Sequence, residues 1–303
     1  IWDVDRTARK LFVTDEKNAI YSLESPLGKP TMVIDGRVPS TLRVSPTSSV
    51  VAFSNDKEDQ DNYALFLWDG RSQARKLSTF SGKDDSVDSF IWERDGKSIY
   101  YTLNDYETKL TKLCHTDLSA SKCFSLDLKG LWNVIDVDRG NILLKYWKSS
   151  SNQHIFHYSI SSGKLTPLSE SGNATKAFFV AGKALLLAED SPECRGNRCL
   201  ISIDPRTNKK EILGLQNVRG HLGDIKPSPD GKLLLVQEAL DGIDSLWIGK
   251  IKDRKVIPTA TNFLSGSHVV WNTRWLSGSE VVFTIENISQ PALIQSFDLR
   301  SKK

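Results

Sequence analysis

The chain has 303 residues, of which 39% are hydrophobic, including eight Trp, twelve Phe and seven Tyr. This content supports a large core and excludes disorder as the main state. Its 40 basic and 37 acidic residues are spread along the chain and leave a net charge of +3, so nucleic-acid binding is not expected. The longest apolar region, Ala177 to Ala188, is interrupted by Gly182-Lys183 and is shorter than the ~20 residues that cross a bilayer.

The first residues, Ile1-Trp2-Asp3, read as the middle of a strand and do not have the pattern of a signal peptide. We therefore expect residues 1–303 to form a single β domain that is cut from a longer protein. Any membrane anchor is then expected upstream of Ile1.

Short apolar strands recur along the whole chain, and their first residues are 39, 49, 43, 42, 49 and 48 positions apart. The strands are Leu11 to Val13, Val50 to Phe53, Ile99 to Tyr101, Ile142 to Leu144, Ala184 to Leu187, Leu233 to Val236 and Val281 to Phe283. A period of this length is expected of four short strands in each blade of a propeller.

The clearest copy of the repeat is Thr41 to Gly70, where two apolar strands follow a Ser-Pro turn. The second strand of each copy is almost continuously apolar, as expected for strands buried on both faces. We predict an all-β, seven-bladed β-propeller of four-stranded antiparallel blades, with six or eight blades as alternatives. An ordinary two-sheet sandwich also fits the turn spacing. The last copy, Val269 to Arg300, stops before a fourth strand, and closed propellers commonly take that strand from the other terminus.

Four cysteines form two local pairs, Cys114 with Cys123 and Cys194 with Cys199, each across a polar stretch that joins two strands. Two short disulfides are the favoured reading, and each is expected to stabilise the fold by about 2–3 kcal/mol in the chain-entropy model. Disulfides persist in oxidising compartments. A shared zinc ion and reduced thiols are the alternatives.

Two segments carry a resemblance to a known repeat. Ser45-Pro46 with Val51-Ala52-Phe53-Ser54, and Ser228-Pro229-Asp230-Gly231-Lys232 with the strand that follows, resemble the WD-type repeat of TolB-like propellers. The same repeat builds the propeller of the prolyl oligopeptidase family. The chain has no Gly-x-Ser-x-Gly elbow, so it lacks the hydrolase domain that supplies the nucleophile in that family.

TolB-like repeats also resemble the extracytoplasmic domains of CadC/ToxR-like regulators. That resemblance implies a periplasmic sensory domain, tethered to the inner membrane by a segment outside residues 1–303.

In a propeller, the loops after the second strands and the connections between blades emerge together at the mouth of the central channel, where ligands usually bind. The residues expected to bind a ligand there are Arg37, Asp84, Asp85, Lys129, Trp132, Arg219, His221 and His268. Loops 55–63 and 81–89 are also rich in Asp and predict an acidic patch for a cation or a basic partner. The competing interpretation of the acidic loops is that their tips are simply solvated. The competing interpretation of Trp132 and Trp271 is that they are core residues.

The leading hypothesis is a non-catalytic extracytoplasmic propeller that binds a protein or a small ligand, as the sensory domain of a membrane-bound transcriptional regulator. The alternative is the substrate-gating propeller of a prolyl oligopeptidase-like serine hydrolase, and a third hypothesis is a lyase or hydrolase acting at the channel mouth. We expect no catalytic residue, no cofactor, no metal and no bound nucleic acid.

Overall fold

The computed structural model contains strands and turns, without a helix, in the residues that it describes. These are 2–15, 19–24, 29–34, 39–57, 60–71, 73–78, 85–149, 152–169, 174–188, 199–215, 220–260, 263–264 and 268–301. The chain divides into two compact units, the first made of residues 1–150 and 156–166 and the second of 151–155 and 167–303. The prediction of one domain stays a prediction.

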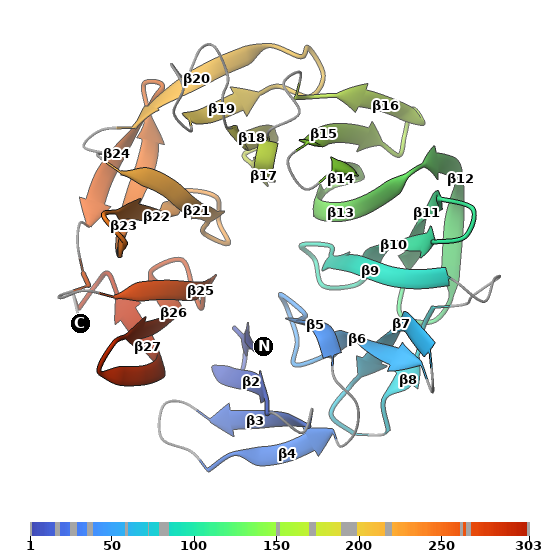
Figure 1. Ribbon diagram of the computed structural model, residues 1–303, viewed down its shortest axis with the longest axis horizontal. Helices are drawn as coiled ribbons and strands as arrows, with labels where there is room; N and C mark the ends of the chain where they lie inside the picture. The colour runs from blue at the N-terminus through green and yellow to red at the C-terminus, as the bar shows by residue number, and fades with distance from the viewer. Residues whose placement is uncertain are drawn as a thin grey trace. The chain divides into compact units, whose positions relative to one another are not determined.

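The first sixteen strands form four antiparallel four-stranded sheets, each with its strands in chain order (Figure 1). The first two sheets contain β1 (Trp2–Asp5), β2 (Lys10–Thr14), β3 (Ile20–Glu24) and β4 (Thr31–Ile34), then β5 (Pro39–Val44), β6 (Val51–Lys57), β7 (Gln60–Trp68) and β8 (Arg75–Lys76). The next two contain β9 (Asp85–Trp92), β10 (Ile99–Asp105), β11 (Leu110–Thr116) and β12 (Ser121–Lys129), then β13 (Leu131–Asp138), β14 (Asn141–Ser149), β15 (Asn152–Ser159) and β16 (Lys164–Pro167).

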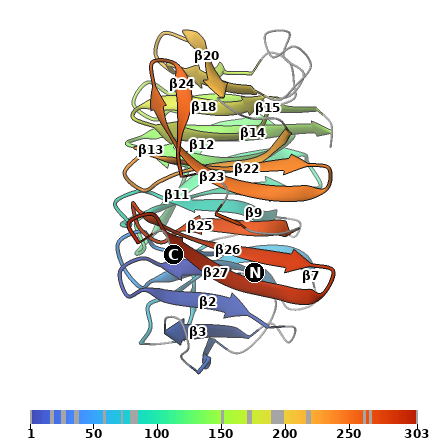
Figure 2. The ribbon, with the colours of Figure 1, turned by 90° about the vertical axis from the view of Figure 1, so that its left-hand side faces the viewer.

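The remaining strands form one eight-stranded and one three-stranded sheet. The larger sheet contains β17 (Ala174–Val180), β18 (Lys183–Ala188), β19 (Cys199–Ile203), β20 (Lys210–Leu215), β21 (His221–Pro227), β22 (Leu234–Leu240), β23 (Ile243–Lys252) and β24 (Lys255–Ala260). The smaller sheet contains β25 (Val269–Trp275), β26 (Glu280–Asn287) and β27 (Gln290–Asp298) (Figure 2).

The prediction of seven separate four-stranded blades is wrong. Four sheets have four strands and one has eight, so five sheets in the described part of the chain are at least as wide as a blade, and a sixth has three strands. The reason is a parallel contact between β20 and β24, in which Gly214 pairs with Lys255 and Leu215 with Val256. This contact joins two antiparallel runs of four strands into one sheet. In addition, β27 pairs only with β26 among the described residues, and β1 pairs with β2.

Several second strands are buried along most of their length, as their continuous apolar sequences predict, whereas in β2 only Phe12 and in β14 only Ile142 to Leu144 are buried. In β10 every residue from Ile99 to Asn104 is buried, and in β26 the same holds from Val281 to Ile285. Neighbouring sheets share these cores: Ala52 and Leu65 of one sheet belong to the same apolar cluster as Tyr101 of the next. Burial on both faces therefore comes from sheets that pack against each other.

Side chains at matching positions connect the first strands of adjacent sheets. The indole of Trp92 donates to the carbonyl of Arg43 at 3.2 Å, and the indole of Trp275 donates to the carbonyl of Lys226 at 3.0 Å. Each pair is separated by 49 residues, close to the repeat length seen in the sequence. The same contact therefore recurs in both units.

The predicted disulfide between Cys114 and Cys123 is present, with the two residues directly opposite each other in β11 and β12. Cys199 is also disulfide-bonded, whereas Cys194, its predicted partner, lies outside the described residues. Within the described part of the chain, no helix has the length and apolar character required to span a membrane.

Candidate functional site

Five of the eight predicted ligand-binding residues lie in the described part of the chain, divided between the two units. Arg37, Asp84 and Arg219 lie outside the described residues. Asp85, Lys129 and Trp132 belong to the first unit, whereas His221, which begins β21, and His268 belong to the second. Lys129 and Trp132 contact each other: the Trp132 indole donates a hydrogen bond to the Lys129 carbonyl at 2.9 Å.

Trp132 is a core residue, in agreement with the competing interpretation of the sequence. It is buried, and its ring lies 4.8 Å from the rings of both Tyr146 and Phe156. Trp271 differs from that interpretation because 63% of its surface is exposed. The two tryptophans therefore have different environments, although both lie near the start of a first strand.

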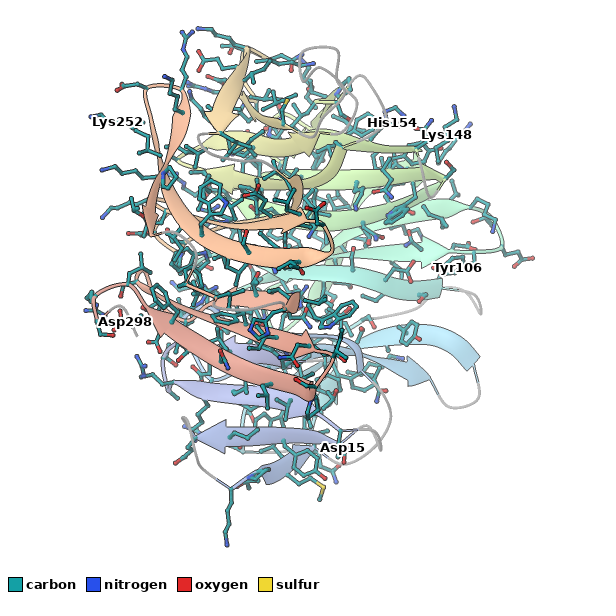
Figure 3. All side chains as sticks on the ribbon, turned by 60° about the vertical axis from the view of Figure 1, so that its left-hand side comes forward. Asp15, Tyr106, Lys148, His154, Lys252 and Asp298 are labelled. Carbon is teal, nitrogen blue, oxygen red and sulfur yellow. A yellow bond between two sulfur atoms is a disulfide. The ribbon has the colours of Figure 1, made fainter. Side chains whose placement is uncertain are left out.

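In the described part of loop 81–89, the acidic side chains are buried or hydrogen-bonded to other residues of the protein. Asp85 is buried, and Asp88 accepts hydrogen bonds from the amide of Asn104 and the hydroxyl of Tyr106. Burial and the Asp88 carboxylate raise the pKa of Tyr106, which lies at the hairpin after β10 (Figure 3). These interactions stabilise the fold and leave Asp88 with less capacity for a ligand.

A polar pocket lies elsewhere in the first unit, between the turn that joins β9 to β10 and the turn that joins β13 to β14. Its volume is about 630 Å³, and it is lined by Glu93, Arg94, Asp95, Ser98, Asp138, Arg139 and Gly140. The sequence analysis did not select these residues. Asp95-Gly96 was recognisable as a turn, but no motif in the sequence pairs that turn with one more than 40 residues later.

Strand β13 contributes two carboxylates to this region: Asp138 lines the pocket, and Asp136 lies beside it, next to the lining residue Arg94. Because side chains alternate along a strand, Asp136 and Asp138 point to the same face, whereas Val137 between them is fully buried. The pairing of β13 with β14 shifts register between Val134 and Asp136, which inserts one extra residue. Such a bulge changes the direction of the side chains that follow it.

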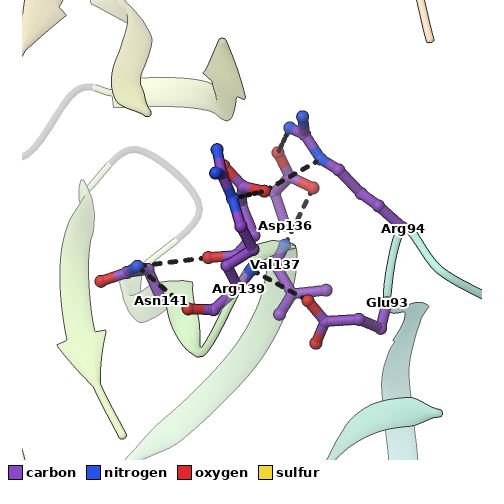
Figure 4. A network of polar contacts seen from close by, with 7 residues as sticks. Glu93, Arg94, Asp136, Val137, Arg139 and Asn141 are labelled. Carbon is purple, nitrogen blue, oxygen red and sulfur yellow. Dashed lines mark hydrogen bonds and ion pairs between the residues drawn. The ribbon is translucent and has the colours of Figure 1, made fainter. Parts of the chain in front are cut away.

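Arg94 reaches across from the other turn to both carboxylates (Figure 4). Its guanidinium lies 3.8 Å from an oxygen of Asp136 and 3.8 Å from an oxygen of Asp138, and its side chain is 40% exposed. Arg139 approaches Asp138 to 3.4 Å from the solvent side. These distances exceed those of well-formed charge-assisted hydrogen bonds, so the ion pairs are loose.

Glu93 also lines the pocket and accepts a hydrogen bond from the Arg139 backbone N–H at 2.9 Å. Burial raises its pKa, and the nearby carboxylates of Asp95 and Asp138 add to that effect. Burial and the neighbouring Glu93 and Asp95 also raise the pKa of Tyr100 to about 12. The pocket is thus a site where negative charge is concentrated and partly desolvated.

The charges of the pocket favour a cationic ligand. With Asp136 included, four carboxylates face two guanidinium groups, a formal net charge of −2. Among the residues that the structure describes, no three His, Cys, Asp or Glu side chains are grouped to hold a metal ion. What the arrangement can do is exchange its loose internal ion pairs for contacts with a bound basic group.

Comparisons with known proteins show the fold. No protein-family model and no curated protein matches the sequence. One of two prolyl endopeptidases studied for inter-domain dynamics superimposes with a TM-score of 0.76 at 15% identity, over 100% of this chain and 48% of that one. The chain therefore spans about half the length of that enzyme.

Two further solved structures have the same architecture. The β-propeller domain of the Trilobed protease from Pyrococcus furiosus gives a TM-score of 0.68 at 15% identity, covering 96% of this chain and 92% of that one. TolB from Acinetobacter baumannii gives 0.55 at 15% identity, covering 96% and 76%. The chain thus has a β-propeller fold similar to the propellers of prolyl oligopeptidases and to TolB.

Proposed function

We propose that this chain is a non-catalytic binding propeller that recognises a polypeptide segment carrying a basic side chain, and that the polar pocket between the two turns is the binding site. The observation that supports the proposal most directly is the pair of 3.8 Å contacts of Arg94 with Asp136 and Asp138 in an open pocket. A ligand guanidinium or ammonium group that approaches these carboxylates more closely replaces a weak ion pair with a stronger one.

Two substitutions in the pocket test this proposal, because they should change the affinity for a basic peptide in opposite directions. Asp136→Asn removes one carboxylate charge and keeps an acceptor for the Val137 N–H, so it should weaken binding of the peptide Gly-Arg-Gly-Arg-Gly. Arg94→Gln removes the internal competitor and should strengthen binding. Isothermal calorimetry at low ionic strength measures both, with Glu24→Gln, an exposed carboxylate paired with Lys10, as the control.

The sign of the Arg94→Gln effect separates recognition from a structural role. If Arg94 only tied the two turns together, its removal would loosen the pocket and weaken binding. Tighter binding therefore supports the proposal, and weaker binding contradicts it. A peptide of the same length with Glu in place of Arg should not bind to any variant.

The setting that we propose is outside the cytoplasm, in the sensory domain of a membrane-anchored transcriptional regulator resembling the CadC/ToxR type. The Cys114–Cys123 disulfide supports an oxidising compartment, and the similarity to TolB supports a periplasmic one. Mass determination of alkylated protein from its native compartment tests this location. Four alkylated thiols without reduction would contradict it.

A second candidate is the substrate-gating propeller of a prolyl oligopeptidase-like hydrolase. It is favoured by a specific observation, because this chain covers 48–50% of two structures of proline-specific peptidases at TM-scores of 0.76 and 0.69. The full-length protein should then react with a fluorophosphonate probe through a serine outside residues 1–303. Absence of labelling in a folded, full-length protein would reject this candidate.

A further inference from the structure

A second surface, in the second unit, exposes a group of apolar side chains. These are Leu240 at 44% exposure, Ile243 at 41%, Val269 at 37%, Trp271 at 63% and Ile288, which is fully exposed. Two exposed acids, Asp241 and Glu286, lie in the same segments. We call these seven residues the apolar–acidic patch.

Hydrogen bonds hold the three segments of the patch at one end of their strands. The Asp244 N–H donates to the His268 carbonyl at 2.9 Å, and the Val270 N–H donates to the Asp244 carboxylate at 2.7 Å. These bonds connect the β22–β23 hairpin to the start of β25. The Trp271 indole donates to Glu286 at 2.7 Å, which connects β25 to the end of β26 just before the turn that contains Ile288.

A bulge in β25 is the reason that Trp271 faces solvent. The pairing of β25 with β26 shifts between Val270 and Thr273, so that Trp271 and Asn272 have no partner in the ladder. Both residues are exposed, whereas Val270 and Thr273 on either side are buried. The strand therefore presents a large aromatic ring outward, at a cost in apolar exposure that an ordinary core position avoids.

Negative charge accompanies these apolar residues. Segments 238–244, 268–272 and 284–290 contain Glu238, Asp241, Asp244 and Glu286 and no Lys or Arg. The lysines of β23 lie toward its other end, which finishes at Lys252 (Figure 3). A partner that covers the patch must therefore supply positive charge together with apolar side chains.

We propose that the apolar–acidic patch docks a segment of a partner protein that carries both basic and apolar side chains. The Trp271 ring, fixed at its indole nitrogen by Glu286, offers its face to a Lys or Arg side chain, while Leu240, Ile243 and Val269 contact apolar neighbours. This surface is separate from the polar pocket and does not depend on it.

Two other occupants fit the patch less well. Symmetric pairing of two copies of this chain places the same surface on both sides of the interface, so the acids of one copy would face those of the other. An anionic membrane surface would repel Asp241 and Glu286 in the same way. A basic, apolar polypeptide satisfies both parts of the patch.

The test uses synthetic peptides with alternating side chains. A Lys-Leu peptide of eight residues should bind to the wild-type chain, whereas Glu-Leu and Lys-Ser peptides of the same length should bind at least roughly tenfold more weakly, as expected when a charge or a buried apolar anchor is lost. Equal binding of the Lys-Leu and Glu-Leu peptides would overturn the proposal.

Substitutions in the patch test whether the Lys-Leu peptide binds there. Trp271→Ala and, separately, Ile243→Ser should each weaken Lys-Leu binding by roughly tenfold or more, as for an anchor residue. Ile251→Ser is the matched control, because Ile251 lies on the same strand as Ile243, is exposed to 37% and stands near the opposite end. Circular dichroism and the unfolding midpoint check that each variant is folded. Unchanged binding by both patch variants would overturn the proposal.

Two further measurements distinguish the occupants. Dimerisation of the wild-type chain that Trp271→Ala abolishes would replace the proposed partner with a second copy, and Trp271-dependent binding to phosphatidylserine vesicles would replace it with a membrane. Trp271→Ala should leave binding of Gly-Arg-Gly-Arg-Gly unchanged, because this peptide probes the polar pocket and has no apolar side chain to contact the patch. Failure of the polar-pocket proposal is therefore separable from failure of this one.

Discussion

Two polar networks, one in each unit, use the same backbone feature and reach opposite results. In the first unit Asp136 follows a bulge in β13 and accepts the N–H of Val137 at 2.9 Å. In the second unit Asp224 follows a bulge in β21 and accepts the N–H of Ile225 at 2.8 Å. The two aspartates thus occupy matching positions in two copies of the repeat.

The two networks differ in the residue two positions after the aspartate. In the second unit it is Lys226, whose ammonium lies 3.0 Å from Asp224, while Lys176 lies 2.6 Å from the other carboxylate oxygen. In the first unit it is Asp138, so the pair is of like charge and depends on Arg94 at 3.8 Å. One network is held by short ion pairs, whereas the contacts of Arg94 in the other are longer, which is the difference on which the proposed binding site rests.

Lys226 also connects two sheets. Its ammonium donates to the carbonyl and the hydroxyl oxygen of Thr273 in β25, at 2.9 and 3.0 Å. Burial lowers its pKa to about 8, although Asp224 opposes that shift. Burial tends to raise the pKa of Asp224, but the adjacent Lys226 and Lys176 more than offset this and hold it below its usual range. The Asp224 network therefore has a structural role.

The largest expected effect comes from breaking the Asp224 network. Asp224→Asn leaves two lysines near each other without their counterion and should lower the free energy of unfolding by about 3 kcal/mol. The matched substitution Asp136→Asn should cost less than about 1 kcal/mol, because Asn still accepts the Val137 N–H and the ion pair lost with Arg94 is long and partly exposed. Urea denaturation of both variants measures the difference, and equal losses would contradict the distinction between the two networks.

Removing the disulfide of the first unit should have the next largest effect. The double substitution Cys114→Ala and Cys123→Ala opens a loop of nine-residue separation, which in the chain-entropy model costs about 2–3 kcal/mol. Urea denaturation without reductant measures the loss. In reductant the wild-type chain also lacks this bond, so the difference between the two proteins should shrink; a difference that persists would assign the effect to packing.

Giving the first network the lysine that the second one has should weaken ligand binding. Asp138→Lys supplies the residue type that the second unit has at this position, and the new lysine should pair with Asp136. Binding of Gly-Arg-Gly-Arg-Gly should then weaken by about tenfold, or about 1.4 kcal/mol. Asp298→Lys makes the same charge change in the other unit and is the control. Equal weakening by both would show that only net charge matters.

The smallest effect concerns pH. Between about 8, the pKa of Lys226 in the folded chain, and the ordinary lysine pKa of about 10.4, the unfolded chain keeps a proton that the folded chain has released. Stability should therefore rise with pH in this range. From pH 8 to 9, urea denaturation of the wild-type chain should show a gain of about 1 kcal/mol over the Lys226→Met variant. Parallel pH profiles would contradict this assignment.

Sequence reasoning succeeded where interactions are local in the chain. The Cys114–Cys123 pair was predictable because a short polar stretch between two strands brings both residues opposite each other. The buried second strands, such as β10, were predictable because continuous apolar residues need partners on both faces.

The same reasoning failed where bulges set the direction of a side chain and where contacts between sheets bring distant residues together. Trp271 reads as a core residue by position, yet a register shift turns it outward. Arg94 and Asp136 meet across two sheets and share no motif. The count of blades was wrong because copies of a repeat do not reveal that β20 and β24 pair with each other.

The period of the apolar strands was enough, by itself, to determine an all-β chain of antiparallel hairpins, because burial of those strands on both faces leaves few other arrangements. Only the tertiary structure decided which distant residues meet these aspartates, Arg94 beside Asp136 and Lys176 beside Asp224. The physical reason is range: hairpins form between neighbours in sequence, whereas the charges that define the polar pocket and the apolar–acidic patch are brought together by bulges and by packing of separate sheets.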